Sequence, residues 1–243
     1  MNTFGRRLLT TQSKQVDIVY GSFMKAPHAH GMEAEALKAL LPENSKTAEQ
    51  CTPPRSGNCY MGTHENLIKS IRSNETDKLI VISSSRNGLP PLNMLNFVKS
   101  LIICEQECEQ EGGTTPLAGL EHAVFGNGNT KWFKTYMSIP RLIDSKLTKL
   151  GSKRIIPRGE YFESYKNLNV EHLKLNDWGE YLWSEIDKGG GWQYGDTWME
   201  GRTCEVLGEE NTKYLELELG VLEQYEESIA QAAHISWRQN KEG

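Results

Sequence analysis

The sequence lacks any apolar run close to the roughly 20 residues that a membrane-spanning helix needs, and the segment MNTFGRRLLTTQSKQ has no long apolar core of a secretory signal. We therefore expect a cytoplasmic protein that does not bind membranes. Cysteine is also scarce. The five cysteines are odd in number and scattered over 243 residues, so we expect reduced thiols rather than a disulfide framework.

The sequence also lacks an excess of positive charge and lacks the regular ligand spacings of zinc sites. Its formal net charge of −5 disfavours unaided binding to nucleic acid. The pair His28 and His30 and the nearby cysteines do not repeat at the intervals that zinc ligands use. We expect neither a nucleic-acid partner nor a metal ion.

What the sequence does contain is an alternation of strand and helix signals, which is typical of a parallel sheet covered by helices. The clearest strand is the continuous apolar run KLIVISSS, as a doubly covered central strand requires. The predicted strands are 16–22, 59–62, 78–85, 120–126 and 153–160. The predicted helices begin near residues 32, 64, 92, 139 and 175, and residues 105–116 are predicted to form an acidic loop.

This pattern predicts a flavodoxin-like three-layer α/β sandwich with a five-stranded parallel sheet in residues 1–190. In such sheets, ligands lie at the carboxyl ends of the strands. Residues 191–243 are predicted to be an extension, because YLELELG alternates as a half-exposed strand and an amphipathic helical pattern follows it. The extension is an interface or the remnant of a further domain, and it is the predicted site of any homo-oligomer contact.

Three segments at those strand ends resemble the FMN domain of diflavin reductases, especially the type fused to soluble haem monooxygenases. They are IVYGSFMKAPHAHGMEAEAL, LIVISSSRNGLPPLNMLNFVKSL and AVFGNGNTKWFKTYMSIPRLIDSKLTKLGSKRIIPRGE. The third is the most specific, through its FGNGN turn, Trp132, the pair Thr135 and Tyr136, and the closing PRGE.

The resemblance implies that FMN lies at these three loops, with its ring stacked on aromatic side chains and its phosphate in the first loop. A strand-to-helix turn favours this because free N–H groups and the positive helix end point at the anion. The implied cofactor-binding residues are Ser22, Lys25, Ala26, Ser84, Ser85, Arg86, Asn87, Gly88, Phe125, Gly126, Asn127, Gly128, Asn129 and Trp132.

The first loop departs from the family pattern. Lys25, Ala26, Pro27 and His28 replace its hydroxyl and glycine series, and Pro27 removes one backbone donor. In the second loop Arg86 replaces the usual aromatic residue, although a guanidinium also stacks on a ring. Both a weakened phosphate site and the loss of that site remain open.

Two functions follow. The first is an FMN-binding electron-transfer protein that passes electrons from a partner reductase to a haem monooxygenase or a similar acceptor. Because YLELEL resembles the start of the FAD domain of diflavin reductases and the chain ends about 25 residues later, a partner is expected to supply the electrons. The alternative is a flavin-independent lyase, isomerase or cyclase acting on a small organic substrate, with His28 as acid or base and Arg86 as anion clamp.

Overall fold

The computed structural model describes residues 15–21, 31–43, 45, 47–57, 64–73, 76–85, 88–128, 136–162 and 169–188. Its strands form one parallel sheet with the order β2-β1-β3-β4-β5, and a further short strand, β6, also pairs with β4. The predicted flavodoxin-like α/β sandwich is confirmed by this order. The strands are β1 (Gln15–Tyr20), β2 (Arg55–Ser56), β3 (Thr76–Ser84), β4 (Glu121–Gly128), β5 (Lys153–Arg154) and β6 (Gly159–Phe162).

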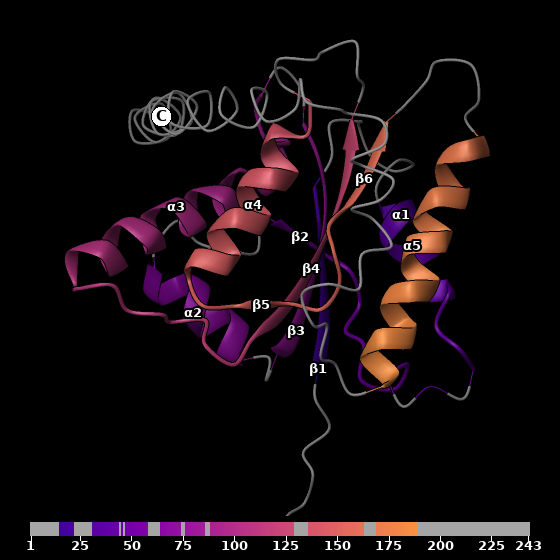
Figure 1. Ribbon diagram of the computed structural model, residues 1–243, viewed down its shortest axis with the longest axis horizontal. Coiled ribbons are helices and arrows are strands. Elements are labelled where there is room, and N and C mark those ends of the chain that lie inside the picture. The colour runs from indigo at the N-terminus through magenta and orange to yellow at the C-terminus, as the bar shows by residue number, and fades with distance from the viewer. Residues whose placement is uncertain are drawn as a thin grey trace, which may run out of the picture.

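The helices form the two outer layers, with α2, α3 and α4 on one side of the sheet and α1 and α5 on the other (Figure 1). The central strand β3 serves both layers because successive side chains point to opposite faces. Leu79 and Val81 enter one buried cluster, and Ile80 and Ile82 enter the other. The helices are α1 (Gly31–Ala39), α2 (His64–Ser73), α3 (Leu95–Gln110, after a 3-10 turn at Leu92–Met94), α4 (Ser138–Lys149) and α5 (Asn169–Asp187).

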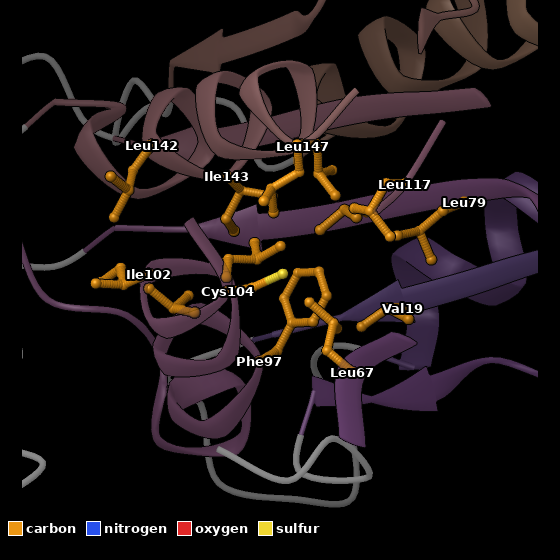
Figure 2. Packing of buried hydrophobic residues seen from close by; sticks show 14 of the residues in the cluster. Val19, Leu67, Leu79, Phe97, Ile102, Cys104, Leu117, Leu142, Ile143 and Leu147 are labelled. Atoms are coloured by element: carbon orange, nitrogen blue, oxygen red, sulfur yellow. The ribbon is translucent and has the colours of Figure 1, made fainter. Parts of the chain in front are cut away.

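On the α2–α4 side, Phe97 and Cys104 of α3 point toward Val19 of β1 and Leu67 of α2, as Figure 2 shows. Leu142, Ile143 and Leu147 of α4 approach from the opposite direction. Cys104 and Cys108 are buried free thiols. Burial and the neighbouring Cys108 raise the pKa of Cys104 to about 12, so this thiol acts as a small apolar side chain rather than as a nucleophile.

On the other side, α1 and α5 are joined by a buried hydrogen bond. The indole Nε1 of Trp183 donates to the carbonyl oxygen of Leu37 at 2.8 Å. Trp178 is 2% exposed and packs its ring against that of Phe125, with centroids 5.2 Å apart. Trp178 and Trp183 are thus part of the buried core between these helices and the sheet.

Two predicted segments differ from the structure. The acidic loop at 105–116 is wrong in its first half, because α3 continues to Gln110. The reason is that Cys104, Glu105 and Cys108 all face the interior, and two lysines of α4, described below, neutralise the carboxylate. The predicted turn at 51–58 contains β2, whereas the strand predicted at 59–62 lies outside the described residues.

The predicted fifth strand, 153–160, is split into β5 and β6. Both pair with β4, at His122↔Arg154 and at Phe125↔Gly159. Pro157 lies in the gap and has no N–H to donate to a ladder, and its carbonyl accepts a hydrogen bond from the indole of Trp178 instead (3.2 Å). β4 is also longer than predicted, because Asn127 and Gly128 of the predicted turn pair with β6.

In the described part of the chain, no helix is both long and apolar enough to cross a membrane.

Candidate functional site

The parallel register brings the ends of four strands to one edge of the sheet, which we call the carboxyl edge. Tyr20 of β1 pairs with Ile82 of β3, and Ser84 of β3 pairs with Asn127 of β4. Asn127 in turn pairs with Tyr161 of β6. The backbone N–H of Gly21 donates to the carbonyl of Ile82 at 2.9 Å. The structure therefore places the start of each predicted loop at this common edge.

The second loop offers hydroxyl groups, but not all of them face outward. Ser83 is buried, and its hydroxyl donates to the carbonyl of Ser84 (3.3 Å). The hydroxyl of Ser85 lies 2.8 Å from that of Ser138 at the start of α4. Ser84 is half-buried at the strand end. Gly88 has φ +78°, a left-handed conformation that favours glycine.

At the start of the third loop, some residues serve the packing of the core and others lie closer to the predicted ligand. The ring of Phe125 lies in the core against Trp178, so only its backbone is available at the edge. Gly126 is required by packing, because a Cβ there would lie 2.7 Å from Sδ of Met137 and 2.8 Å from Pro140. A Cβ on Gly128 would meet only Tyr136 and Met137 side-chain atoms, at 3.3 Å or more. A side chain at Gly128 would thus be less crowded than one at Gly126, although it would still contact Tyr136 closely.

Helix α4 begins at this edge with an unusual backbone conformation. Met137 precedes the helix with φ +56°, the only non-glycine residue with positive φ in the described part of the chain, and it is fully buried. Its carbonyl accepts a hydrogen bond from the N–H of Arg141 (3.0 Å). The guanidinium carbon of Arg141 lies 5.8 Å from the ring centroid of Tyr136, a cation–π contact. Burial and the Glu160 charge raise the pKa of Tyr136.

Several predicted site residues fall outside the described part of the chain, and so does the whole extension predicted for residues 191–243. The predicted site residues outside the described part of the chain are Ser22, Lys25, Ala26, His28, Arg86, Asn87, Asn129 and Trp132.

Sequence reasoning missed an ion network behind the carboxyl edge. Nε and Nη2 of Arg141 on α4 donate to the two carboxylate oxygens of Glu160 on β6, at 2.8 and 2.9 Å. Nε of Arg158 also donates to Glu160 (2.8 Å), and its Nη1 donates to Asp144 of α4 (2.6 Å). A two-point Arg–carboxylate pair fixes orientation as well as distance. The PRGE sequence of the third segment is therefore part of the scaffold.

Asp144 extends this network toward the opposite edge of the sheet. It accepts hydrogen bonds from Nε of Arg154 (2.8 Å) and from Nε2 of His122 (3.2 Å). Nδ1 of His122 lies 2.8 Å from the hydroxyl of Ser152. These three residues have the order of a hydrolytic Ser–His–Asp triad, but none is more than 3% exposed, and His122 lies near the start of β4. Their burial identifies them as structural.

The pKa values of the two carboxyl groups follow from this arrangement. Burial alone raises the pKa of a carboxyl group, yet hydrogen bonds and cations hold both groups below their ordinary values. At Glu160 the opposing partners are Arg141 and Arg158. At Asp144 they are His122, Arg154 and Arg158. Both groups are thus ionised at neutral pH.

Two spacings in the sequence pointed to the network. Arg141 and Asp144 are three residues apart in the helical pattern, so they share a face of the helix. In PRGE the opposite charges of Arg158 and Glu160 are two residues apart, which is the spacing of side chains on one face of a strand. What the sequence did not show is that these charges face inward. Among the described residues, no group of three or more His, Cys, Asp or Glu side chains is placed to hold a metal ion.

Comparison with known proteins shows which sequences and structures the chain is similar to. Residues 62–174 match the flavodoxin family model. A bifunctional cytochrome P450/NADPH–P450 reductase of Bacillus cereus is 34% identical over 110 residues, which are 45% of this chain and 9% of that protein. A self-sufficient cytochrome P450 monooxygenase of Phanerodontia chrysosporium is 29% identical over 206 residues, 79% of this chain and 18% of that protein. The matched region is therefore less than a fifth of either relative.

Solved flavodoxins resemble the structure more distantly in sequence. The flavodoxin of Streptococcus pneumoniae TIGR4 covers 70% of this chain and 99% of its own, with 15% identity and a TM-score of 0.49. Oxidised flavodoxin 2 of Bacillus cereus covers 71% and 99%, with 15% identity and a TM-score of 0.48. The strand order and the family match, rather than these likenesses, carry the assignment. The described part of the chain therefore has a flavodoxin-like fold, and residues 62–174 are similar in sequence to the flavodoxin family. Parts of the chain are also similar to fusions of cytochrome P450 with NADPH–P450 reductase.

Proposed function

We propose that this domain binds FMN at the carboxyl edge and transfers electrons from a partner reductase to a haem monooxygenase or a similar acceptor. The observation that carries the proposal is the family match over residues 62–174, which includes β3, β4 and the start of α4 at that edge. Its relatives are named as P450/NADPH–P450 reductases, and such a protein needs a carrier between its two redox centres.

The described residues fit the ring end of a flavin. Ser84 and Asn127 are adjacent in the register and offer backbone and side-chain hydrogen-bonding groups at the ends of β3 and β4. Gly128 has no side chain, so a ligand can approach the backbone at the end of β4 closely. The atoms nearest to a Cβ built at this glycine belong to the side chains of Tyr136 and Met137. Gly88 follows at the second loop with a positive φ that favours glycine. A planar group with a polar rim matches this combination of small and hydrogen-bonding residues.

FMN, when bound, supplies the electron-accepting chemistry, and the protein's residues orient it and shield it. In this proposal Ser84, Ser85, Asn127 and the backbone of the second and third loops hold the ring edge. The hydrogen bond between Ser85 and Ser138 fixes the second loop to α4. Trp132 and Arg86 stack on the ring. Ser22, Lys25 and Ala26 hold the phosphate, and the remaining predicted contacts come from Asn87, Gly88, Phe125, Gly126, Gly128 and Asn129.

A spectrum and a titration test the proposal. We expect flavin absorption bands in freshly purified protein, or quenching of flavin fluorescence when the protein is titrated into FMN. Comparison with riboflavin isolates the contribution of the phosphate: a phosphate-binding first loop makes FMN bind more tightly than riboflavin. A colourless protein that quenches neither compound, even when it is in excess over the flavin, rules the proposal out.

The partners are tested with the loaded protein. We expect an NADPH-dependent reductase to bleach the flavin bands, and a ferric haem monooxygenase to restore them when added after the reductase is removed. A Trp132→Ala variant is expected to bind FMN more weakly, because it loses one stacking surface. A Trp132→Phe variant is the matched control, since it keeps an aromatic face.

A further inference from the structure

Both ends of the third loop pack against the start of α4. At one end, Gly126 lies so close to Met137 and Pro140 that a Cβ would overlap both of them. Gly128 faces the ring of Tyr136, which lies 3.3 Å from a Cβ built at that glycine. The residues that enter the loop are thus in contact with the residues that leave it. Any shift of α4 along the sheet moves both ends.

Glu160 joins the three elements that meet there. It is the register partner of Gly126, so its backbone lies beside the loop entrance. Its carboxylate receives the two-point hydrogen bond of Arg141, one turn into α4, and Nη2 of Arg158 lies 2.7 Å away. Only 8% of its side chain is exposed. The fork geometry restricts rotation and sliding of α4 in a way that a single point charge does not.

We infer that Glu160 is a positioning residue for the flavin site, because it fixes the two ends of the third loop, residues 126–128 and 136–141, against each other. It does not itself touch the flavin. The link to flavin rests on the proposed function, whereas the link to the loop ends rests on the contacts above. The effect is transmitted through Arg141 to Tyr136, whose ring the guanidinium contacts, and from Tyr136 to Gly128.

The chain contains a matched control for this role. Glu105 on α3 is also a buried carboxylate, with 8% of its side chain exposed, and it also binds two cations, Lys146 and Lys149. Those lysines lie in the last part of α4, far along the helix from the carboxyl edge. Glu105→Gln and Glu160→Gln therefore remove the same charge from a similar environment at opposite ends of one helix.

Hydrogen exchange of the flavin-free protein tests the positioning role. We expect Glu160→Gln to increase amide exchange at residues 126–128 and 136–141, and Glu105→Gln to leave exchange there unchanged. If Glu160→Gln does not fold, Arg141→Lys replaces it, because it keeps the charge and removes the fork. Equal exchange at these residues in both variants and in the unmodified protein would overturn the inference.

Flavin binding supplies the second measurement. We expect Glu160→Gln to weaken FMN binding by about tenfold, the lower end of the effect that loss of a supporting partner has at metal sites, and to change the visible circular dichroism of the bound flavin. Glu105→Gln should do neither. If the unmodified protein fails to bind FMN, the proposed function is wrong and the exchange experiment alone decides the positioning role. If FMN binds to all three proteins with equal affinity and spectrum, the inference is wrong.

Discussion

The two ends of α4 are held by different chemistry. At its start, Arg141 donates two hydrogen bonds to the carboxylate of Glu160, and Gly126 and Tyr136 pack against the same turn. At its end, Lys146 and Lys149 reach the single carboxylate of Glu105 on α3, and Gly151 follows with φ +96°.

The difference shows which end needs defined geometry. An ammonium group is a point charge on a flexible stem. The two lysines therefore attract the end of α4 to α3 without fixing the orientation of the helix. A guanidinium fork fixes the plane of its partner. The start of α4 borders the candidate flavin site, whereas the end lies beside α3 and the apolar cluster shown in Figure 2.

The largest expected effect comes from Asp144, in the middle of the helix between the two ends. In Asp144→Asn, Arg154, Arg158 and His122 lose the carboxylate that binds them. We expect the free energy of unfolding to fall by about 3–5 kcal/mol, the usual cost of breaking a buried ion pair, measured by urea denaturation.

The control for that substitution is Asp177→Asn on the exposed surface of α5. It should change the free energy of unfolding by no more than about 0.5 kcal/mol. Similar effects for the two variants would mean that the network around Asp144 contributes little to stability.

A glycine pair tests the start of α4 next. Gly126→Ala forces a Cβ into Met137 and Pro140, and we expect it to lower the free energy of unfolding by about 1–3 kcal/mol. Gly128→Ala brings a Cβ to 3.3 Å from the Tyr136 ring, a tight contact that a small shift of the ring relieves. We therefore expect a smaller loss of stability than in Gly126→Ala, while the FMN affinity falls. The reverse pattern would show that Gly126, not Gly128, faces the ligand.

Acid is expected to weaken both ends of the helix. The pKa values of Glu160 and Glu105 are lowered from the ordinary value of 4.5 in the folded protein, so their ionised forms stabilise the fold above that pH. This contribution is lost as the pH falls through the lowered values. Urea midpoints measured between neutral pH and acid should therefore decrease, and less steeply in Glu160→Gln than in the unmodified protein. An unchanged slope would contradict the ion-pair interpretation.

The smallest effect is expected at the end of α4. Lys149 is 59% exposed on its side chain, although its Nζ lies 2.7 Å from Glu105. Lys149→Gln should cost no more than about 1 kcal/mol, as exposed pairs do. Lys146→Gln should cost more, since Lys146 is buried. Thermal unfolding of both variants at low and high salt measures the difference, and a larger loss at Lys149 would contradict it.

Much of the fold could be predicted from the sequence because periodic patterns are local. The run at 78–85 predicted β3 almost to its ends, and the helix start predicted near residue 139 lies one residue from the start of α4. The errors arose where long-range contacts overruled local signals. The acidic residues after Cys104 suggested a loop, but Lys146 and Lys149, more than 40 residues away in the sequence, allow the helix to bury Glu105.

The candidate site was less predictable. The sequence located the loops but could not assign the side-chain directions within them. It predicts Phe125 among the cofactor-binding residues, and the structure adds that its ring packs against Trp178 in the core, which leaves the backbone for that role. It also gave no partner for Arg141 or Glu160. Such pairs are set by the packing of α4 on β6, which the chain's local pattern does not specify.

Local sequence patterns set the order of strands and helices, the positions of the loops and the apolar faces, because alternation and helical spacing depend only on neighbouring residues. The folded structure was needed to show which charges face inward and which glycine the packing requires. Those choices depend on atoms that are distant in the chain and are brought together by the parallel sheet. The position of the carboxyl edge can therefore be predicted from the sequence, whereas the ion network that supports it is seen only in the folded protein.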